Sequence, residues 1–144
     1  MLDRVQAEVD AVVASCDLRL STLRRMSVLR AAFRETLRLY PLVFGLPRHA
    51  KQTFQCEGFT IEKGSTVYVA ASINHFLPEY FPDPYKFDVD RYFPPRNEHR
   101  QKFAMSPFGL GAHYCLGSNL TEMFLLTTMT GLLSTVDFSL PSPD

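Results

Sequence analysis

Residues 106–117 read Ser106-Pro107-Phe108-Gly109-Leu110-Gly111-Ala112-His113-Tyr114-Cys115-Leu116-Gly117, and the interpretation of the 144-residue chain starts from this stretch. Gly109 and Gly111 allow backbone turns that a side chain would obstruct, and Gly117 leaves room for a bulky group beside Cys115. Residues 116–133 follow as an almost continuous apolar run without proline, which predicts a helix. Cys115 is therefore expected at a helix N-terminus, where free N–H groups and the helix dipole favour a thiolate, a good metal ligand.

Several roles for this cysteine follow from the residues alone. A buried structural cysteine is the commonest fate of a free thiol. A nucleophile would need a base, but His113 lies two residues away in one tight loop and would need unusual geometry to reach the sulfur. Zinc is disfavoured because Cys16 and Cys56 are isolated and form no Cys-x-x-Cys pair.

A haem thiolate is the fourth role, and it comes from a resemblance. The pattern Phe108-Gly109-x-Gly111-x-His113-x-Cys115-x-Gly117 resembles the haem-binding signature of the cytochrome P450 family. The resemblance implies that Cys115 is the axial ligand of a haem iron and that the other matched residues bind or pack around the cofactor. His113 stands where an arginine more often contacts a haem propionate. Its charge depends on pH, so that contact should weaken near neutrality.

A second motif lies in residues 27–40, which predict a helix that ends before Pro41 and has Ser27 as its N-cap. At about 100° per residue, Glu35 and Arg38 share a face with apolar side chains, so we expect a buried pair and not a surface ion pair. The pair resembles the E-x-x-R element of the same family, which a downstream arginine completes. Arg91 matches that arginine, and the trio is expected to form a structural clamp for the loop that leads to Cys115.

An apolar segment bounded by prolines follows this helix and is predicted to be extended. Core packing would explain it, but the resemblance implies that it passes the haem and faces the substrate. The substrate-facing residues would be Val43, Phe44, Gly45 and Leu46. The resemblance also gives Arg48 the contact with the second propionate.

The remaining patterns complete a mainly α fold with a small antiparallel β-sheet (α+β), similar to the C-terminal portion of a cytochrome P450. Alternating β-branched and aromatic residues around two turns predict the sheet, and six prolines after it predict an irregular meander. The expected order along residues 1–144 is a helix J-like segment (1–16), the E-x-x-R helix (27–40), the small sheet (51–72), the meander (73–107), the cysteine loop (108–117) and a helix L-like segment (116–133).

Composition narrows the class of function. The chain has 46% apolar residues and a formal net charge of zero, which indicates a globular domain and gives no electrostatic case for nucleic acid. Three scattered cysteines suggest a reducing compartment. No signal peptide and no tract of about eighteen apolar residues occurs, so no membrane segment is expected within the chain.

The resemblance implies a haem-thiolate monooxygenase that takes electrons from a redox partner of the reductase or ferredoxin type and inserts one atom of O2 into an apolar small molecule. A haem-thiolate isomerase or peroxygenase stays open, as does a truncated, non-catalytic product that acts as an interaction module. Two basic groups would attract an acidic electron donor. They are Arg24, Arg25, Arg30 and Arg34 in the first group, and Arg96, His99, Arg100 and Lys102 in the second.

The resemblance covers only part of the family's fold. It leaves out the central helix that handles oxygen and a final hairpin after Phe138-Ser139-Leu140. The chain alone is therefore expected to cover a haem on its cysteine side only. It is also expected to leave helix faces such as Val5/Val9/Val12 and Leu29/Phe33/Leu37 partly exposed.

Overall fold

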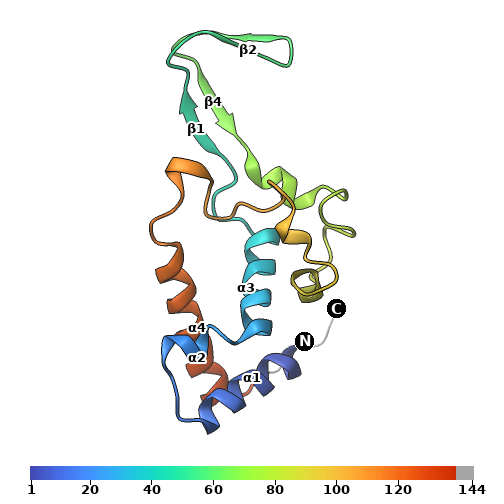
Figure 1. Ribbon diagram of the computed structural model, residues 1–144, viewed down its shortest axis with the longest axis vertical. Helices are drawn as coiled ribbons and strands as arrows, with labels where there is room; N and C mark the ends of the chain where they lie inside the picture. Colours follow the sequence, from blue (N-terminus) through green and yellow to red (C-terminus); the bar gives the residue numbers. More distant parts are fainter. Residues whose placement is uncertain (139–144) are drawn as a thin grey trace.

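A computed structural model describes residues 1–138 of the chain, and the expected absence of a final hairpin after Phe138-Ser139-Leu140 concerns residues outside this range. Four α-helices form its lower part in Figure 1: α1 (Leu2–Ala14), α2 (Leu20–Leu23), α3 (Ser27–Leu39) and α4 (Ser118–Thr135). Helices α1, α3 and α4 contact one another, so the two ends of the sequence share one packed unit. None of the helices described here combines the length and the hydropathy that crossing a bilayer requires.

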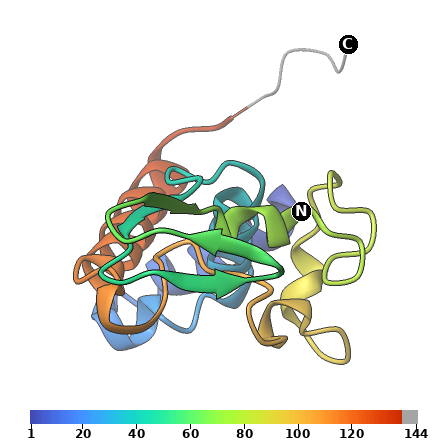
Figure 2. The ribbon, with the colours of Figure 1, turned by 90° about the horizontal axis from the view of Figure 1, so that it is seen from above.

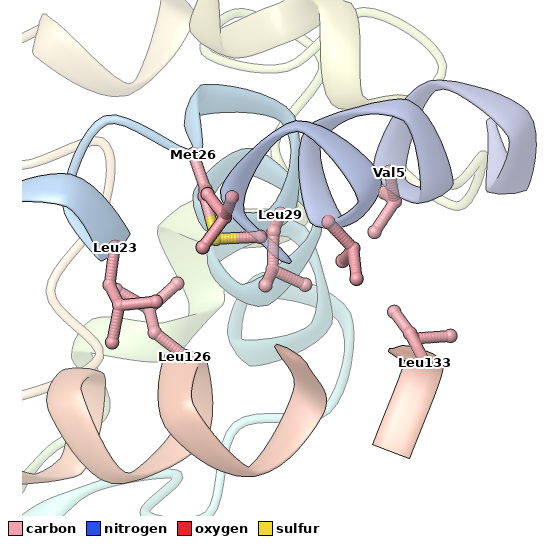
Figure 3. Close-up of a cluster of buried hydrophobic side chains, with 8 residues drawn as sticks. Val5, Leu23, Met26, Leu29, Leu126 and Leu133 are labelled. Carbon is pink, nitrogen blue, oxygen red and sulfur yellow. The ribbon is translucent and has the colours of Figure 1, made fainter. Parts of the chain in front are cut away.

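One apolar cluster joins these helices (Figure 3). Its buried members are Val5, Val9, Val12, Leu23, Met26, Leu29, Leu126 and Leu133. The expectation that the Val5/Val9/Val12 and Leu29/Phe33/Leu37 faces stay partly exposed is wrong, because all six side chains are at most 9% exposed. Val5, Val9, Val12 and Leu29 are buried because α4 adds Leu126 and Leu133 to their cluster. Phe33 is covered by Phe108 of the cysteine loop.

The start of α3 also differs from the expectation. Ser27 lies inside the helix, and Met26 is the N-cap. The carboxylate of Glu8, on α1, accepts hydrogen bonds from the backbone N–H groups of Val28 and Leu29 at 3.0 and 3.1 Å. It also accepts a bond from the Ser27 hydroxyl at 3.0 Å. A carboxylate from a second helix therefore satisfies the free donors at the positive end of the α3 dipole.

Two antiparallel ladders rise from the end of α3 (Figures 1 and 2). Strand β1 (Leu46–His49) pairs with β4 (Thr66–Val69), in the register Leu46↔Val69. Strand β2 (Phe54–Cys56) pairs with β3 (Phe59–Ile61) through a two-residue turn whose residues both have positive φ, which suits a type I′ hairpin. Strand pairing thus begins at Leu46, before the predicted start of the sheet at residue 51, and it includes Arg48.

Residues 70–117 contain no α-helix and no strand, as the prolines indicate. They form short 3-10 turns: η1 (Ala71–Phe76), η2 (Val89–Tyr92), η3 (Glu98–Arg100) and η4 (Gly111–His113). Helix α4 begins at Ser118, two residues later than the predicted start at 116. Cys115 therefore lies before the N-cap, Gly117, and outside the first helical turn.

Candidate functional site

The cysteine loop holds Cys115 at the surface. Its backbone N–H donates to the carbonyl of Phe108 at 2.9 Å, a bond that closes the loop, and its own carbonyl accepts from the N–H of Ser118 at the start of α4 at 3.3 Å. The Cys115 side chain is exposed, which argues against a buried structural cysteine. A Cβ added to Gly117 would lie 3.8 Å from the Cys115 Sγ, so the glycine leaves the sulfur uncrowded.

Two glycines shape the turn before Cys115. Gly109 has φ +77° and Gly111 has φ +66°, a left-handed conformation that L side chains rarely adopt. A Cβ at Gly109 would meet the His113 carbonyl at 3.4 Å, whereas one at Gly111 would face open space. The Phe108 ring packs against Phe33 of α3 and Tyr114, with ring centroids 6.5 and 6.4 Å away. The loop is thus anchored on α3 while its tip faces outward.

The structure brings the predicted substrate-facing segment to this loop. The Leu46 side chain lies 3.7 Å from the position of an added Gly109 Cβ. Gly45 lets the segment pass strand β4 closely, because a Cβ there would come within 3.3 Å of Ala70 and Val69 backbone atoms. Val43 and Phe44 are exposed, and so is the neighbouring Leu42.

The two predicted propionate contacts differ in their surroundings. Arg48 is partly buried and lies two residues after Leu46 on β1, so both side chains point to the same face of the strand. Its guanidinium donates to the carbonyl of Pro47 at 2.9 Å. His113 is exposed in η4, and no side-chain hydrogen bond within residues 1–138 involves it. The cysteine loop therefore contacts Leu46 on the Arg48 face of β1, whereas the His113 side chain of the same loop is exposed.

Glu35, Arg38 and Arg91 come together behind the loop, and all three are fully buried. The Arg38 guanidinium forms a two-pronged pair with the Glu35 carboxylate at 2.8 and 2.9 Å. The Arg91 Nε donates to the same carboxylate at 3.3 Å. Both guanidiniums also donate to meander carbonyls, among them those of Pro84 and Pro82 at 2.6 Å. The trio thereby connects α3 to several points of an otherwise irregular segment.

Sequence reasoning missed two members of this network. The Glu98 carboxylate accepts from Arg91 at 2.8 Å, so two carboxylates balance two guanidiniums in the buried cluster. The Tyr92 hydroxyl donates to Glu35 at 3.0 Å. Burial and the nearby Glu35 carboxylate raise the pKa of Tyr92 well above its ordinary value of 10.0, so the phenol stays a donor. Tyr92 directly follows Arg91, but no spacing rule marked Tyr92 as a partner of Glu35 or Glu98 as a partner of Arg91.

The surface around Cys115 fits a flat, largely apolar ligand that carries a metal and acidic substituents. Exposed apolar side chains flank the thiol in the sequence, in the loop and at the start of α4: Leu110, Tyr114, Leu116, Leu120 and Phe124. Leu42, Val43 and Phe44 are also exposed, in the segment whose Leu46 reaches the loop. Leu116, which directly follows the cysteine, is fully exposed. Exposure of so large an apolar side chain to water is unfavourable unless another group covers it. A thiol, a basic side chain on β1 and this apolar surface suit a haem, whose axial ligand, propionates and ring edge need those groups.

A cavity of about 240 Å³ lies beside the loop and is lined by Arg34, His99 and Phe108, among others. Partial burial lowers the pKa of Arg34 below its ordinary 12.5, and the charge of Arg30 adds to this effect, as does that of Arg100 more weakly. Residues from both predicted basic groups therefore lie close together. Two members of these groups are paired with carboxylates: Arg30 with Glu122 at 2.6 Å, and Arg96 with Asp88 at 2.7 Å and with Glu98.

Comparisons with known proteins agree on one family. A sequence model described as cytochrome P450 matches residues 1–144. A sterol 14alpha-demethylase of Mycolicibacterium vanbaalenii is 35% identical over 142 residues, which is 97% of this chain and 31% of the relative. A putative cytochrome P450 120 of Synechocystis is 35% identical over 139 residues, 96% of this chain and 31% of the relative. A probable cytochrome P450 4aa1 of Drosophila melanogaster is 32% identical over 114 residues, which is 79% of this chain and 22% of the relative. The chain thus spans between about a fifth and a third of the length of these relatives.

Proposed function

Because the chain belongs to the cytochrome P450 family, we propose that it forms the cysteine side of the haem site in a haem-thiolate monooxygenase. The observation that carries the proposal is the exposed Cys115, presented by a glycine loop that is anchored on α3 and flanked in the sequence by the exposed apolar residues Leu110, Tyr114 and Leu116. When bound, haem supplies oxygen activation at its iron, and the protein supplies the axial ligand and the shape of the site.

Each residue of the site has a proposed task. Cys115 donates its thiolate to the iron, and the bond from its N–H to the Phe108 carbonyl fixes the direction of approach. Gly109, Gly111 and Gly117 would leave room for the cofactor beside the loop, because none of them carries a side chain. Arg48 and His113 hold the propionates. Glu35, Arg38 and Arg91 act at a distance, by holding the meander from which the loop emerges.

The proposed substrate is an apolar small molecule. Val43, Phe44, Gly45 and Leu46 form an exposed or half-buried apolar segment, and Leu46 reaches the cysteine loop. A substrate that buries apolar surface on this segment would gain roughly 25 cal/mol per Å². One relative is named a sterol 14alpha-demethylase. This name is compatible with an apolar substrate but does not identify the substrate of this chain.

The proposed electron source is an acidic redox protein of the reductase or ferredoxin type. Arg34 lines the cavity beside the cysteine loop, and it forms a basic face with Arg100. Arg30 is also near, but its guanidinium is paired with Glu122 at 2.6 Å, so Arg34 and Arg100 carry the charge of this face. Such a face would attract an acidic partner to the thiolate side of the site. A haem-thiolate isomerase or peroxygenase would use the same cysteine without a donor protein, so the basic face favours the monooxygenase.

The experiment that tests the proposal is ligand spectroscopy with cysteine variants. Reduced, CO-treated protein that contains this chain in its full-length context should show the red-shifted Soret band of thiolate ligation. Cys115→Ala should abolish that band, because no other thiol occupies a glycine loop, whereas Cys16→Ala and Cys56→Ala should retain it. A thiolate-type band in the Cys115→Ala protein would overturn the assignment. Donor-dependent oxygenation of an apolar substrate would then separate the monooxygenase from the peroxide-driven alternative.

A further inference from the structure

The 3-10 turn η1 (Ala71–Phe76) connects three parts of the site through successive polar side chains. The Ser72 hydroxyl donates to the carbonyl of Phe44, in the apolar segment, at 2.5 Å. The Asn74 amide donates to the carbonyl of Phe103, just before the cysteine loop, at 3.0 Å. His75 bonds both to Ser106, near the cysteine loop, and to Arg38 of the clamp on α3. A short turn thus holds both segments that face the proposed haem.

His75 makes the most direct of these connections. It is 1% exposed, and its ring Nε2 accepts a hydrogen bond from the backbone N–H of Ser106 at 3.2 Å. Its own carbonyl accepts from the Arg38 guanidinium at 2.8 Å. One residue therefore bonds to the clamp through its backbone and to the first residue of the cysteine stretch through its ring.

The bond to Ser106 determines the protonation state of the ring. A backbone N–H can only donate, so Nε2 must offer its lone pair and the single ring proton must lie on Nδ1. Nδ1 is buried and has no hydrogen-bond partner within residues 1–138. A second proton would have to bind at Nε2, where it would face the Ser106 N–H and break the bond.

The surroundings of the ring oppose that second proton. Burial lowers the pKa of His75 below its ordinary 6.5, and the Arg38 charge acts in the same direction, although the Arg38 backbone acts in the opposite one. From α3 the ring faces Arg38, which is paired with Glu35. Residues 103–106, the other segment packed against the ring, bring no charged side chain.

We propose that neutral His75 is a positioning residue for the cysteine loop: it holds the loop start through Ser106, and loss or protonation of its ring acceptor releases that segment. The inference rests on the proposed function in one respect, namely that the loop carries the iron ligand, Cys115. The contact itself needs no cofactor, so it is open to measurement in haem-free protein.

Amide hydrogen exchange at Ser106 tests the contact directly. His75→Leu removes the acceptor, and the protection of the Ser106 amide should fall at least about fivefold, the equivalent of one ordinary hydrogen bond. His75→Gln can place its side-chain oxygen near the Nε2 position and should restore most of the protection. His49→Gln, at an exposed strand histidine, is the matched control and should change nothing. Equal protection in wild type and His75→Leu would overturn the proposal, as would a failure of His75→Gln to protect better than His75→Leu.

The pH dependence supplies a test that remains if His75→Leu does not fold. The unfolded chain binds a proton at His75 near pH 6.5, whereas the folded chain resists it, so the contact is fully stable above that pH and weakens as pH falls below it. Ser106 protection, corrected for intrinsic exchange, should therefore drop on acidification in wild type and not in His75→Gln. His99 is the other histidine whose pKa burial lowers. An acid response that survives in His75→Gln and disappears in His99→Gln would overturn the assignment.

Two readouts separate this inference from the proposed function. Cys115→Ala should leave Ser106 exchange unchanged while removing thiolate ligation. In haem-loaded protein, the CO complex should change from the thiolate-type band to the blue-shifted band as pH falls. This change should occur at a higher pH in His75→Leu than in wild type, and His75→Gln should return it toward the wild-type pH. A loaded protein whose CO spectrum ignores His75 at every pH, while Ser106 exchange responds, would overturn the link to the ligand but leave the function intact.

Discussion

Glu35 accepts hydrogen bonds from Arg38, Arg91, Tyr92 and the Asp88 backbone, so its carboxylate has a charged or polar partner on every side. Glu35→Ala would leave two buried guanidiniums with fewer partners, and we expect it to lower the free energy of unfolding by roughly 3–5 kcal/mol. Tyr92→Phe removes a single bond to the same carboxylate and should cost only about 1 kcal/mol. Denaturant unfolding of both variants measures the difference.

The matched control for this prediction is Arg4→Ala. Arg4 also pairs with a carboxylate, that of Asp90 at 2.8 Å, but both partners are about half exposed. Its removal should cost less than about 1 kcal/mol, because water and salt screen the pair. If Glu35→Ala and Arg4→Ala lower the free energy of unfolding by the same amount, the buried network does not stabilise the fold more than a surface ion pair does.

Sequence reasoning could reach part of this network and not the rest, for a physical reason. Helical periodicity places Glu35 and Arg38 on an apolar face, so their burial was predictable, and it is confirmed. Glu98 and His75 lie in 3-10 turns of the meander, where no repeating geometry relates one side chain to the next. Their partners depend on the three-dimensional path of that segment, which a single sequence does not specify.

At the scale of the elements, the N-terminus of α3 depends on α1. The Glu8 carboxylate bonds to the Val28 and Leu29 N–H groups, and no side chain next to the N-cap does so. We expect Glu8→Ala to destabilise the fold by about 1–2 kcal/mol, since it removes both a cap and a favourable charge at the helix dipole. Thermal or denaturant unfolding measures the loss.

Two further variants divide this effect into its parts. Glu8→Gln keeps an oxygen acceptor but loses the charge, so it should recover part of the stability. Ser27→Ala removes only the hydroxyl that donates to Glu8, and it should cost less than Glu8→Ala. A larger loss for Ser27→Ala would mean that the serine is the effective cap after all.

The bounds of the elements show what local patterns can and cannot indicate. The predicted helix at 27–40 agrees with α3 to within one residue, because Pro41 ends it through local sterics. The cap from Glu8 was missed because it joins residues about twenty positions apart on different helices. The start of strand pairing at Leu46 was missed as well, since the pairing partner Val69 is needed to make that residue a strand.

At the scale of the whole molecule, the α1 and α3 faces that the sequence suggested would be exposed are buried, whereas apolar side chains in and near the cysteine loop are open to water. Val5, Val9, Val12 and Leu29 pack with Leu126 and Leu133 of α4, and Phe33 packs against Phe108. Leu42, Leu116 and Phe124 are at least 72% exposed. Covering such a patch contributes roughly 25 cal/mol per Å², so a bound cofactor would add to the stability of this unit.

The basic face is also a property of the whole molecule, because Arg34 comes from α3 and Arg100 from η3. Reduction of the loaded protein by an acidic donor should slow as salt rises, since the Debye length shortens from about 10 Å at 0.1 M toward 3 Å at 1 M. Arg100→Glu should slow reduction several-fold at low salt and flatten the salt dependence.

Arg100 is suited to this test because it is exposed and forms no ion pair within residues 1–138, whereas reversing Arg96 would also break its pairs with Asp88 and Glu98. Lys63→Glu changes the charge by the same amount in the turn between β3 and β4 and is the control. Stopped-flow reduction that responds equally to Lys63→Glu and Arg100→Glu would show that net charge, and not the position of the basic face, guides the donor.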